Sequence, residues 1–577
     1  KSASERLPAV ISNYGTALKH GHKYLFRCLP RMLTLWFEFS ERIHKEQQSG
    51  NASSGRAKNP MQQSSQQVDG LIRRFISDVP TYQWFTALPQ LMSRSTHPRQ
   101  ETQQIVKDIV AHILAQYSRQ AVWIVVPATK SKNAQRASVA KDMINLARQQ
   151  TDATGKDTIR AVEQLIRELI NVCQHKTQDR HVKDGLKVSQ HFPQLRKALT
   201  KAGNAVVMMP SQTALTVALP DAGPRRASSP HDSPTTSHDK NAHHDAFPQS
   251  EVLIEEVEEK LQVLNSLMKP SRLSLVGTDG RTYDFLCKRE DKGDMRKDSR
   301  LMEFNTMLNR LFRTNPESAK RALHLRTFSV CPLNEECGLI EWVPNTHTLR
   351  TLLAKIYEQD NTKVKTTDIR DSYEKMTGNQ TARRLGEATA GEVRWTQEWC
   401  RPRFPPVFHK WLLKTFPEPS RWFATRLNCA RSMAVWSMVG YVLGLGDRHG
   451  ENILFDAKSG DCVHVDFSCL FEKGLALAQP EVVPFRLTPN MVDVLGVTGT
   501  EGAFREVSEV TMKLLRDKQD LLMTNLETFL HDPLVEWKKR SATEKEPPQA
   551  THMLGRVKAK LNGQGGTIQC DPHPPTP

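Results

Sequence analysis

A loop, a β-hairpin and a second loop, together spanning residues 446–467, restrict this chain to few folds. The first loop reads Gly-Asp-Arg-His-Gly-Glu-Asn, and the apolar runs 453–455 and 463–467 follow it around a Lys-Ser-Gly turn. Apolar residues that alternate on both sides of such a turn predict a β-hairpin. Asp466 ends the second run, directly before a phenylalanine. The pattern places several carboxylate and amide side chains beside one short hairpin, which indicates a catalytic or metal-binding site.

The spacing of these polar residues suits phosphoryl transfer. That reaction asks little covalent chemistry of a protein, but it requires an oriented nucleophile and neutralised phosphate charge. Asp447 and Asn452 are five residues apart, the interval between the base and a metal ligand in protein-kinase catalytic loops. Asn452 and Asp466 are the predicted metal ligands, because their oxygen atoms suit a hard cation such as Mg²⁺ and leave room for ATP phosphates. We predict that Asp447 is catalytic and that His449 shares proton handling or contacts the γ-phosphate.

A second predicted hairpin, residues 273–288, supplies a lysine for the nucleotide. Its residues alternate with a period of two on either side of a Thr-Asp-Gly turn. Lys288, at the end of the second strand, is placed to reach the ATP phosphates. Asp298 and Glu303 follow it in the sequence, and either carboxylate can pair with the lysine and fix it. Asp298 is therefore counted with Lys288 in the predicted cofactor site.

Residues 338–343 are predicted to form a strand that leads out of this β-rich part. Glu341, Trp342 and Val343 stand where a two-lobed kinase crosses from its small lobe to its large lobe. Their backbone groups would bond adenine, and the Trp342 indole would pack against it. The predicted fold class is therefore an α+β bilobal, protein- or lipid-kinase-like catalytic domain.

The rest of the chain is predicted to divide around this domain. Residues 1–220 form an all-α solenoid, since apolar residues recur three and four apart. The clearest helical segments are 24–43, 68–76, 102–117 and 139–148, and residues 47–67 look like a disordered insertion. Residues 221–249 are rich in Pro, Ser, His and Asp, which is typical of a disordered linker. The small lobe then occupies 250–343, the large lobe 344–540, and a tail 541–577.

Residues 251–269 are expected to form the helix that opens the small lobe. Ser250 can act as the N-cap, with Glu251 in the positive first turn. The apolar residues that recur on one face are Val257, Leu261, Leu264 and Met268. Pro270 would end the helix.

These stretches together resemble the phosphatidylinositol 3-kinase-related protein kinases. The resemblance is carried by Lys288 and by residues 294–304, 340–343, 438–449, 463–467, 483–488 and 529–537. The order Asp-Arg-His at 447–449 is inverted from that of ordinary protein kinases and looks like the order of this superfamily. Residues 30–36 and 120–123 resemble the end of the helical FAT region that precedes such kinase domains, so 1–220 is interpreted as FAT-like.

The resemblance implies a Mg²⁺- and ATP-dependent serine/threonine protein kinase that favours Ser or Thr followed by Gln. It also implies DNA-damage and replication-stress signalling in the nucleus, a helical adaptor as partner, and DNA contact only indirectly, through coated single strands. Chains of this family end in a helical segment with terminal aromatic residues, the FATC. Residues 551–554 resemble the approach to it, but no FATC is recognisable in 541–577. With a first residue other than Met, this suggests a C-terminal fragment that turns over more slowly than a tail-bearing relative.

Three other functions were weighed. A lipid kinase shares the fold, but a polyanionic headgroup calls for several basic side chains, and residues 466–488 hold three acidic against two basic ones, a net charge of −1. A catalytically impaired scaffold would explain the missing FATC, although the predicted catalytic, metal and phosphate residues are all present, namely Asp447, Asn452, Asp466 and Lys288. Direct nucleic-acid binding rests on the net charge of +17 alone. Without a run of 18 apolar residues, no membrane contact is expected.

Overall fold

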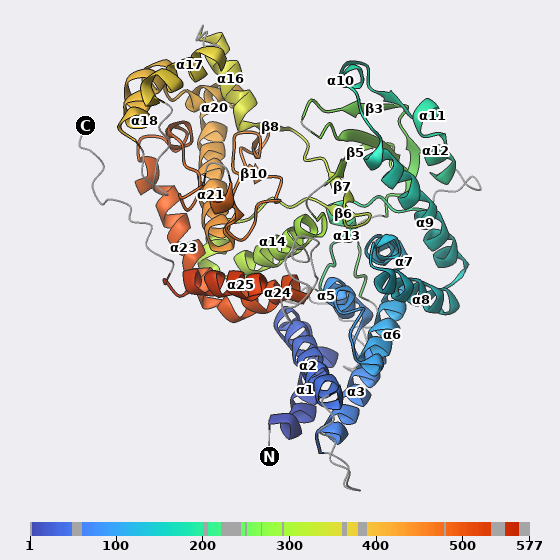
Figure 1. Cartoon of the computed structure of the whole chain (residues 1–577). Helices are drawn as coiled ribbons and strands as arrows, with labels where there is room; N and C mark the ends of the chain where they lie inside the picture. Colours follow the sequence, from blue (N-terminus) through green and yellow to red (C-terminus); the bar gives the residue numbers. More distant parts are fainter. Residues whose placement is uncertain are drawn as a thin grey trace, which may run out of the picture. The chain divides into compact units, whose positions relative to one another are not determined.

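The computed structural model (Figure 1) divides the chain into two compact units, which are described separately. It describes residues 3–48, 60–199, 206–220, 244–248, 251–266, 268–290, 294–360, 366–378, 389–477, 480–531 and 548–564. The first unit comprises Lys1–Arg300, Phe328–Trp342 and Thr524–Ser541. The second comprises Leu301–Thr327, Val343–Met523 and Ala542–Pro577.

The N-terminal part of the first unit is helical, as predicted. Its helices are α1 (Ala3–His20), α2 (Leu25–Gln48), α3 (Pro60–Asp78), α4 (Thr81–Thr86), α5 (Leu88–Ser93), α6 (Gln100–Gln116), α7 (Ser118–Val125), η1 (Val126–Lys130), α8 (Ala134–Gln150), α9 (Ala153–Gln174), α10 (Asp179–Asp184), α11 (Val188–His191), α12 (Pro193–Leu199) and α13 (Gln212–Leu215). The disordered insertion predicted for 47–67 is partly wrong. Helix α3 already begins at Pro60, a residue suited to the first turn of a helix. Residues 49–59, and 221–243 of the predicted linker, lie outside the described residues.

The same unit contains a seven-stranded antiparallel sheet. Its strands are β1 (Leu186–Lys187), β2 (Ile254–Val257), β3 (Lys260–Val263), β4 (Ser271–Gly277), β5 (Thr282–Arg289), β6 (Val330–Pro332) and β7 (Cys337–Glu341). Their order is β1-β3-β4-β5-β7-β6, with β2 paired to β4. The predicted hairpin of Lys288 is confirmed as β4 and β5, in which Leu273 faces Phe285. The edge strand β1 comes from the predicted helical region and joins the sheet by pairing Leu186 with Leu261.

The helix predicted for 251–269 is wrong, because this segment forms β2 and β3. Val257 pairs with Leu275, and Gln262 pairs with Arg272, so β4 supplies hydrogen-bond partners to both strands. The spacing of the apolar residues fits a helix face, but a paired and half-buried strand satisfies Ile and Val side chains equally well. The tertiary partner therefore decides the structure.

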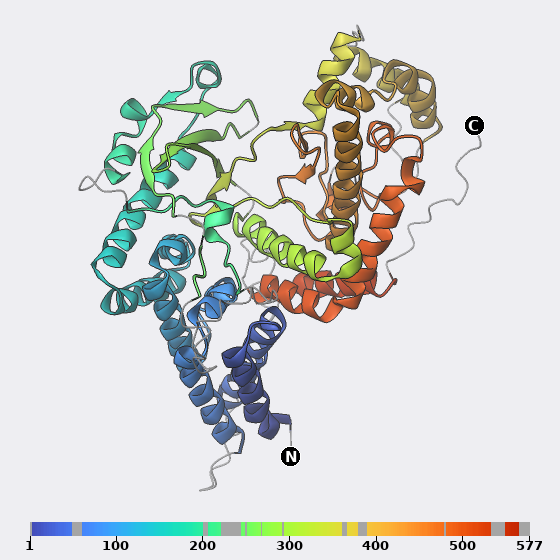
Figure 2. The same ribbon diagram turned by 180° about the vertical axis from the view of Figure 1, so that it is seen from behind.

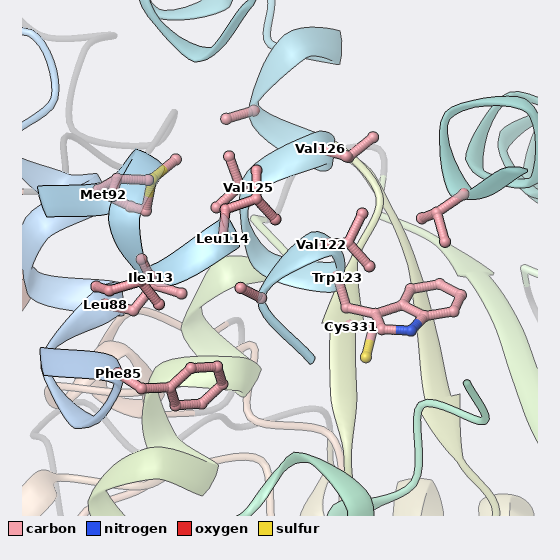
Figure 3. Packing of buried hydrophobic residues seen from close by; sticks show 14 of the residues in the cluster. Phe85, Leu88, Met92, Ile113, Leu114, Val122, Trp123, Val125, Val126 and Cys331 are labelled. Atoms are coloured by element: carbon pink, nitrogen blue, oxygen red, sulfur yellow. The ribbon is translucent and has the colours of Figure 1, made fainter. Parts of the chain in front are cut away.

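Helices and sheet of the first unit share one apolar core. The core includes residues of both parts, for example Trp36 in α2 and Leu273 in β4. Figure 3 shows a part of it in which Trp123 of α7 lies beside Cys331 of β6. The Trp123 indole donates a hydrogen bond to the Met208 carbonyl at 3.2 Å, so its polar atom is satisfied although the ring is buried. The strands that carry the cofactor residues are thus backed by the helical region.

The second unit is mainly helical and holds a small three-stranded sheet. Helices α14 (Arg296–Thr314) and α24 (Gln519–His531) contribute residues to both units. Its other elements are α15 (Pro316–Lys320), β8 (Thr346–Thr348), α16 (Leu349–Gln359), α17 (Thr366–Thr377), α18 (Ala390–Arg394), η3 (Trp395–Cys400), α19 (Arg401–Arg403), α20 (Phe408–Thr415), α21 (Pro419–Leu443), β9 (Ile453–Asp456), β10 (Cys462–His464), η4 (Lys473–Ala476), α22 (Pro489–Asp493), η5 (Gly499–Glu501), α23 (Ala503–Asp517) and α25 (Pro548–Leu561). The sheet order is β10-β9-β8, which confirms the second predicted hairpin.

The long helix α21 supports this hairpin from one side, as the view from behind in Figure 2 shows. The fully buried Trp436 of α21 stacks on the His464 ring of β10, with centroids 4.7 Å apart and an interplanar angle of 4°. In the described part of the chain, no helix combines the length and the apolar character that crossing a membrane requires.

Candidate active site

The loop of Asp447 begins where α21 ends. Gly444 closes the helix in the left-handed conformation, with φ 62° and ψ 45°. A Cβ at this position would lie 2.6 Å from the backbone nitrogen of Glu472, so glycine is required both by the dihedral angle and by the close approach. The chain enters β9 at Ile453. Residues 445–452 are therefore held between a buried helix and a strand.

Asp447, His449 and Asn452 lie together on this loop. Asp447 has φ 58°, a left-handed conformation that aspartate tolerates better than most residues. Its carbonyl accepts a hydrogen bond from Asn452 Nδ2 at 2.9 Å, and His449 Nε2 lies 4.0 Å from its Oδ1. His449 Nδ1 accepts the N–H of Glu451 at 3.2 Å, so a neutral ring carries its proton on Nε2. The Asp447 and His449 side chains are 40% and 51% exposed, which makes them accessible to a substrate.

Arg448 joins this loop to the loop that carries Asp466. Its guanidinium donates to the carbonyls of Gly446 at 2.8 Å, of Val465 at 2.9 Å, and of Asp466. The side chain is buried, and burial lowers the pKa of Arg448, while the carboxylates of Asp466 and Asp447 oppose that shift. A planar cation with three carbonyl acceptors fixes the relative positions of the two loops.

Asp466 lies beyond the hairpin rather than at the end of its second strand, as the sequence predicted. The strand ends at His464, because Asp466 turns the chain with φ 59°. Its Oδ1 accepts the N–H of Ser468 at 3.3 Å. The next residue, Phe467, is buried, and the Arg448 guanidinium lies 5.8 Å from its ring centroid. The left-handed turn thus separates a polar carboxylate from a buried aromatic ring.

Asn452 and Asp466 fit a Mg²⁺ ion by their chemistry. The Asn452 side chain is 7% exposed, and its amide nitrogen is bound to the Asp447 carbonyl, so the amide oxygen is the atom left for a cation. Asp466 adds a carboxylate. Mg²⁺ prefers such hard oxygen ligands and is commonly bound by one or two protein groups together with substrate phosphates.

Lys288 and Asp298 belong to the first unit. Lys288 pairs with Gly338 across β5 and β7, and its Nζ lies 2.5 Å from the Glu290 carboxylate. Both side chains of this ion pair are largely buried, at 14% and 18% exposure. Asp298 lies in the first turn of α14 and is 7% exposed. Whether Asp298 or Glu303 also fixes Lys288 stays a prediction.

Glu341 ends β7, and its carboxylate has structural partners. It accepts the backbone N–H groups of Gln212 and Ser329, each at 2.8 Å. Val343, the first residue of a segment in the second unit, is buried, and its carbonyl accepts Thr346 Oγ1 at 2.8 Å. The contact with adenine that the sequence predicts for this stretch stays a prediction.

Trp342 is held on both its backbone and its ring. Its N–H donates to the Asp284 carbonyl at 2.8 Å. The Arg272 guanidinium lies over the indole, 4.8 Å from the ring centroid, and also contacts the Asp284 carboxylate. This cation–π contact orients the indole without burying it in the apolar core.

Helix α25 anchors the segment that follows Asp466. Glu472 has φ 61°, and its carboxylate contacts Lys560 Nζ at 2.8 Å and also Arg556. Lys560 donates to the Tyr441 carbonyl at 2.8 Å, with its Nζ 5.0 Å from that ring centroid. Residues 565–577 of the predicted tail lie outside the described residues.

Removing the two cations of α25 is expected to slow phosphotransfer. In Arg556→Ala/Lys560→Ala, the loss of two partly exposed charge-assisted contacts costs about 1.4 kcal/mol of loop anchoring. Turnover should fall by roughly tenfold while ATP affinity stays unchanged, since about 1.4 kcal/mol corresponds to tenfold in rate. Steady-state kinetics on a peptide substrate check this. Lys558→Ala, an exposed position on the same helix, is the matched control. Equal turnover in the double variant and the control would show that α25 does not support the loop.

Sequence reasoning missed Arg448, Glu290 and Glu472. Arg448 stands inside the recognised loop, but nothing local distinguishes a buried guanidinium from a solvated one. Glu290 stands two residues after Lys288, directly beyond the end of β5 at Arg289, and an alternation continued past the strand end would place both side chains on one side, a signal that was available. Glu472 depends on a helix far along the chain, which no local pattern reveals.

Two family models match the sequence. The model described as phosphatidylinositol 3- and 4-kinase matches residues 282–539, and the model described as serine/threonine-protein kinase ATR-like, HEAT repeats, matches residues 67–166. The first match contains Lys288 and the whole segment 446–467. The second falls on helices α3 to α9.

Similar curated proteins cover nearly the whole chain. The serine/threonine-protein kinase ATR of Arabidopsis thaliana is 42% identical over 561 residues, which are 95% of this chain and 19% of that protein. Protein kinase rad3 of Schizosaccharomyces pombe is 37% identical over 574 residues, 97% of this chain and 22% of that protein. The chain therefore spans about a fifth of the length of the curated relatives it matches.

A solved structure of the FAT and kinase domain of CtTel1 aligns with a TM-score of 0.74 and 25% identity, covering 97% of this chain and 35% of that chain. This likeness confirms the predicted fold class, a kinase-like catalytic domain preceded by a helical solenoid. The mixture of helical region and sheet-containing lobe in the chain agrees with it.

Proposed function

We propose that the chain is a member of the phosphatidylinositol 3-kinase-related protein kinase family, and that it transfers the γ-phosphoryl group of ATP to serine and threonine side chains of proteins. The relatives that it matches are named as protein kinases. Residues 250–540 would be the catalytic part, preceded by the FAT-like region 1–220 and the linker 221–249.

Each predicted site residue receives a role in this reaction. Asp447 accepts a hydrogen bond from the substrate hydroxyl and orients it. His449 donates a hydrogen bond from its Nε2–H to a γ-phosphate oxygen. Asn452 and Asp466 hold Mg²⁺, which supplies neutralisation of the phosphate charge when bound.

The nucleotide contacts complete the proposal. Lys288 binds phosphate oxygens, and Asp298 is its second candidate partner beside Glu290. The backbone of Glu341 to Val343 bonds the adenine ring, with the Trp342 indole packed against it.

The single observation that carries the proposal is the set of contacts of Arg448. Its guanidinium binds a carbonyl beside Asp447, and the carbonyls of Val465 and Asp466, so the base and the metal carboxylate share one rigid support. In-line phosphoryl transfer depends on positions accurate to well below about 1 Å, and such a support serves that need. A scaffold without activity has no use for it.

A lipid substrate fits the segment after Asp466 less well. Of its acidic residues, Glu472 contacts Lys560 and Arg556, and these two cations are therefore already engaged in ion pairs. A polyanionic headgroup would need free basic groups beside the transferred phosphate. The charge of this segment favours a protein substrate.

We further propose the finer functions that the family resemblance implies. These are a preference for Ser or Thr followed by Gln and action in DNA-damage and replication-stress signalling in the nucleus. The partner would be a helical adaptor resembling the ATR-interacting protein, with DNA reached only through coated single strands. These functions concern the whole protein, of which this chain spans about a fifth by comparison with its relatives.

One assay tests the proposal. The purified chain is incubated with Mg-ATP and, in separate arms, a Ser-Gln peptide, the same peptide with Gln replaced by Ala, and phosphoinositide vesicles. We expect phosphate transfer to the first peptide, at least about tenfold slower transfer to the second, none to lipid, and loss of all transfer with a chelator. Transfer to lipid alone would establish the lipid kinase. ATP binding without transfer in any arm would establish the scaffold.

A further inference from the structure

Glu481, which follows the segment after Asp466, contacts the backbone of Asp447. Its carboxylate oxygen Oε2 accepts the Asp447 N–H at 2.7 Å, across 34 residues of sequence. Its own N–H donates to the Gly474 carbonyl at 3.0 Å. The carboxylate is therefore directed at the proposed base, while its backbone is tied to η4.

Two glycines leave the space that this carboxylate occupies. A Cβ on Gly446 would lie 2.6 Å from Glu481 Oε2, and a Cβ on Gly474 would lie at the same distance from the same atom. Real Cβ atoms do not approach other atoms so closely, so any larger residue at either position would displace the carboxylate. The sequence thus provides a fitted space for one carboxylate oxygen beside the Asp447 peptide.

The backbone N–H and the backbone C=O of Asp447 are consequently both held by side chains. Asn452 Nδ2 binds its carbonyl at 2.9 Å, and Glu481 binds its N–H at 2.7 Å. Asp447 has φ 58°, a left-handed conformation that residues other than glycine adopt only where their surroundings impose it. The two hydrogen bonds impose it and so fix the direction of the Asp447 side chain.

We propose that Glu481 is a positioning residue for the phosphotransfer reaction, which acts by holding Asp447 in its productive orientation. This inference rests on the proposed role of Asp447. The contact couples the position of Glu481 to the orientation of Asp447. The segment after Asp466 must be folded back at Glu481 before the Asp447 side chain is oriented.

Three variants test the inference through different properties. Glu481→Gln keeps an oxygen that accepts the Asp447 N–H, so its turnover should stay within about threefold of wild type. Glu481→Ala removes the acceptor, and turnover should fall by about 10- to 100-fold while the KM for ATP stays within about twofold, because misplacement of a catalytic group acts on the chemical step. Glu509→Ala, an exposed glutamate paired with Arg505 at the surface, is the control with unchanged turnover.

A double variant shows whether Glu481 acts through Asp447. Asp447→Asn/Glu481→Ala should be no slower than Asp447→Asn alone, since the second change removes support from a group already disabled. Hydrogen–deuterium exchange of the peptide that contains Asp447 gives a readout without activity. It should become faster in Glu481→Ala and stay as in wild type in Glu481→Gln.

The outcomes separate this inference from the proposed function. Three results would overturn the positioning role. The first is a double variant whose loss of turnover equals the product of the two single losses. The others are equal losses of turnover in Glu481→Gln and Glu481→Ala, and unchanged turnover in Glu481→Ala. If Asp447→Asn retains wild-type turnover, the catalytic assignment of Asp447 fails first, and the inference fails with it. A Glu481→Ala chain that loses its melting transition is judged by Glu481→Gln and the exchange data, and faster exchange in Glu481→Gln overturns the role.

Discussion

Asp466→Ala lowers phosphotransfer by more than about 10³-fold, because the loss of a metal ligand removes several kcal/mol of charge stabilisation in the transition state. The fold should survive. Asp466 accepts a long hydrogen bond from Ser468 at 3.3 Å, and alanine at its positive φ adds backbone strain, so we expect a loss of stability of about 1–2 kcal/mol. Turnover at saturating Mg²⁺ and a thermal melt measure both effects.

Two further variants make this result interpretable. Asp466→Asn tolerates the left-handed backbone and loses only the charge, so it separates strain from metal binding. Asp517→Ala, an exposed carboxylate at the end of α23, should change neither measurement. Activity above a few per cent in Asp466→Ala would falsify the assignment of this residue as a metal ligand.

Asp447→Asn is expected to reduce turnover by about 10²–10⁴-fold, the usual effect of removing a positioned acid–base or orienting group. Asparagine also accepts positive φ, and the hydrogen bonds that Asn452 and Glu481 make involve only the backbone of residue 447. The loop should therefore keep its conformation, and the dissociation constant for ATP should change by less than about twofold. Nucleotide titration and single-turnover kinetics distinguish the two quantities.

The opposite result has a definite meaning. A tenfold weaker ATP affinity with unchanged turnover would make Asp447 a binding residue. The reaction would then depend on His449, whose Nε2 lies 4.0 Å from the Asp447 carboxylate. His449→Gln, which keeps an N–H donor but cannot carry a positive charge, would then show the larger loss of turnover.

Features that depend on local sequence were predictable. The hairpin β9–β10 and the hairpin of Lys288 follow from alternation around a tight turn, and both are present. The spacing of Asp447 and Asn452 also reflects a local requirement. A side chain five residues on reaches back to the Asp447 carbonyl because the loop between them is a single turn.

Features that depend on distant partners were not predictable. The segment 251–269 has apolar residues at helical spacing, yet β4 supplies hydrogen-bond partners to residues 254–257 and 260–263, which therefore form strands. Likewise, Glu472 and Glu481 look like solvated acids in the sequence. Glu472 contacts helix α25, about ninety residues further along the chain. Glu481 accepts the backbone N–H of Asp447, which precedes it in the sequence. Only the tertiary structure reveals which acids have such partners.

Strand β5, which carries Lys288, packs into the same apolar core as the helices that precede it in the first unit. Cys173 of α9 lies 3.8 Å from the carbonyl of Gly338, the residue that pairs with Lys288, and β1 extends the same sheet from within the helical region. Because β5 and α9 share one apolar core, we expect them to unfold together. The helices before residue 221 and the strands after residue 249 are therefore not independent folding units, although a stretch rich in Pro and Ser separates them in the sequence. A substitution that loosens α9 will raise the population of molecules in which the strand of Lys288 is unfolded, although it leaves every residue of the active site unchanged.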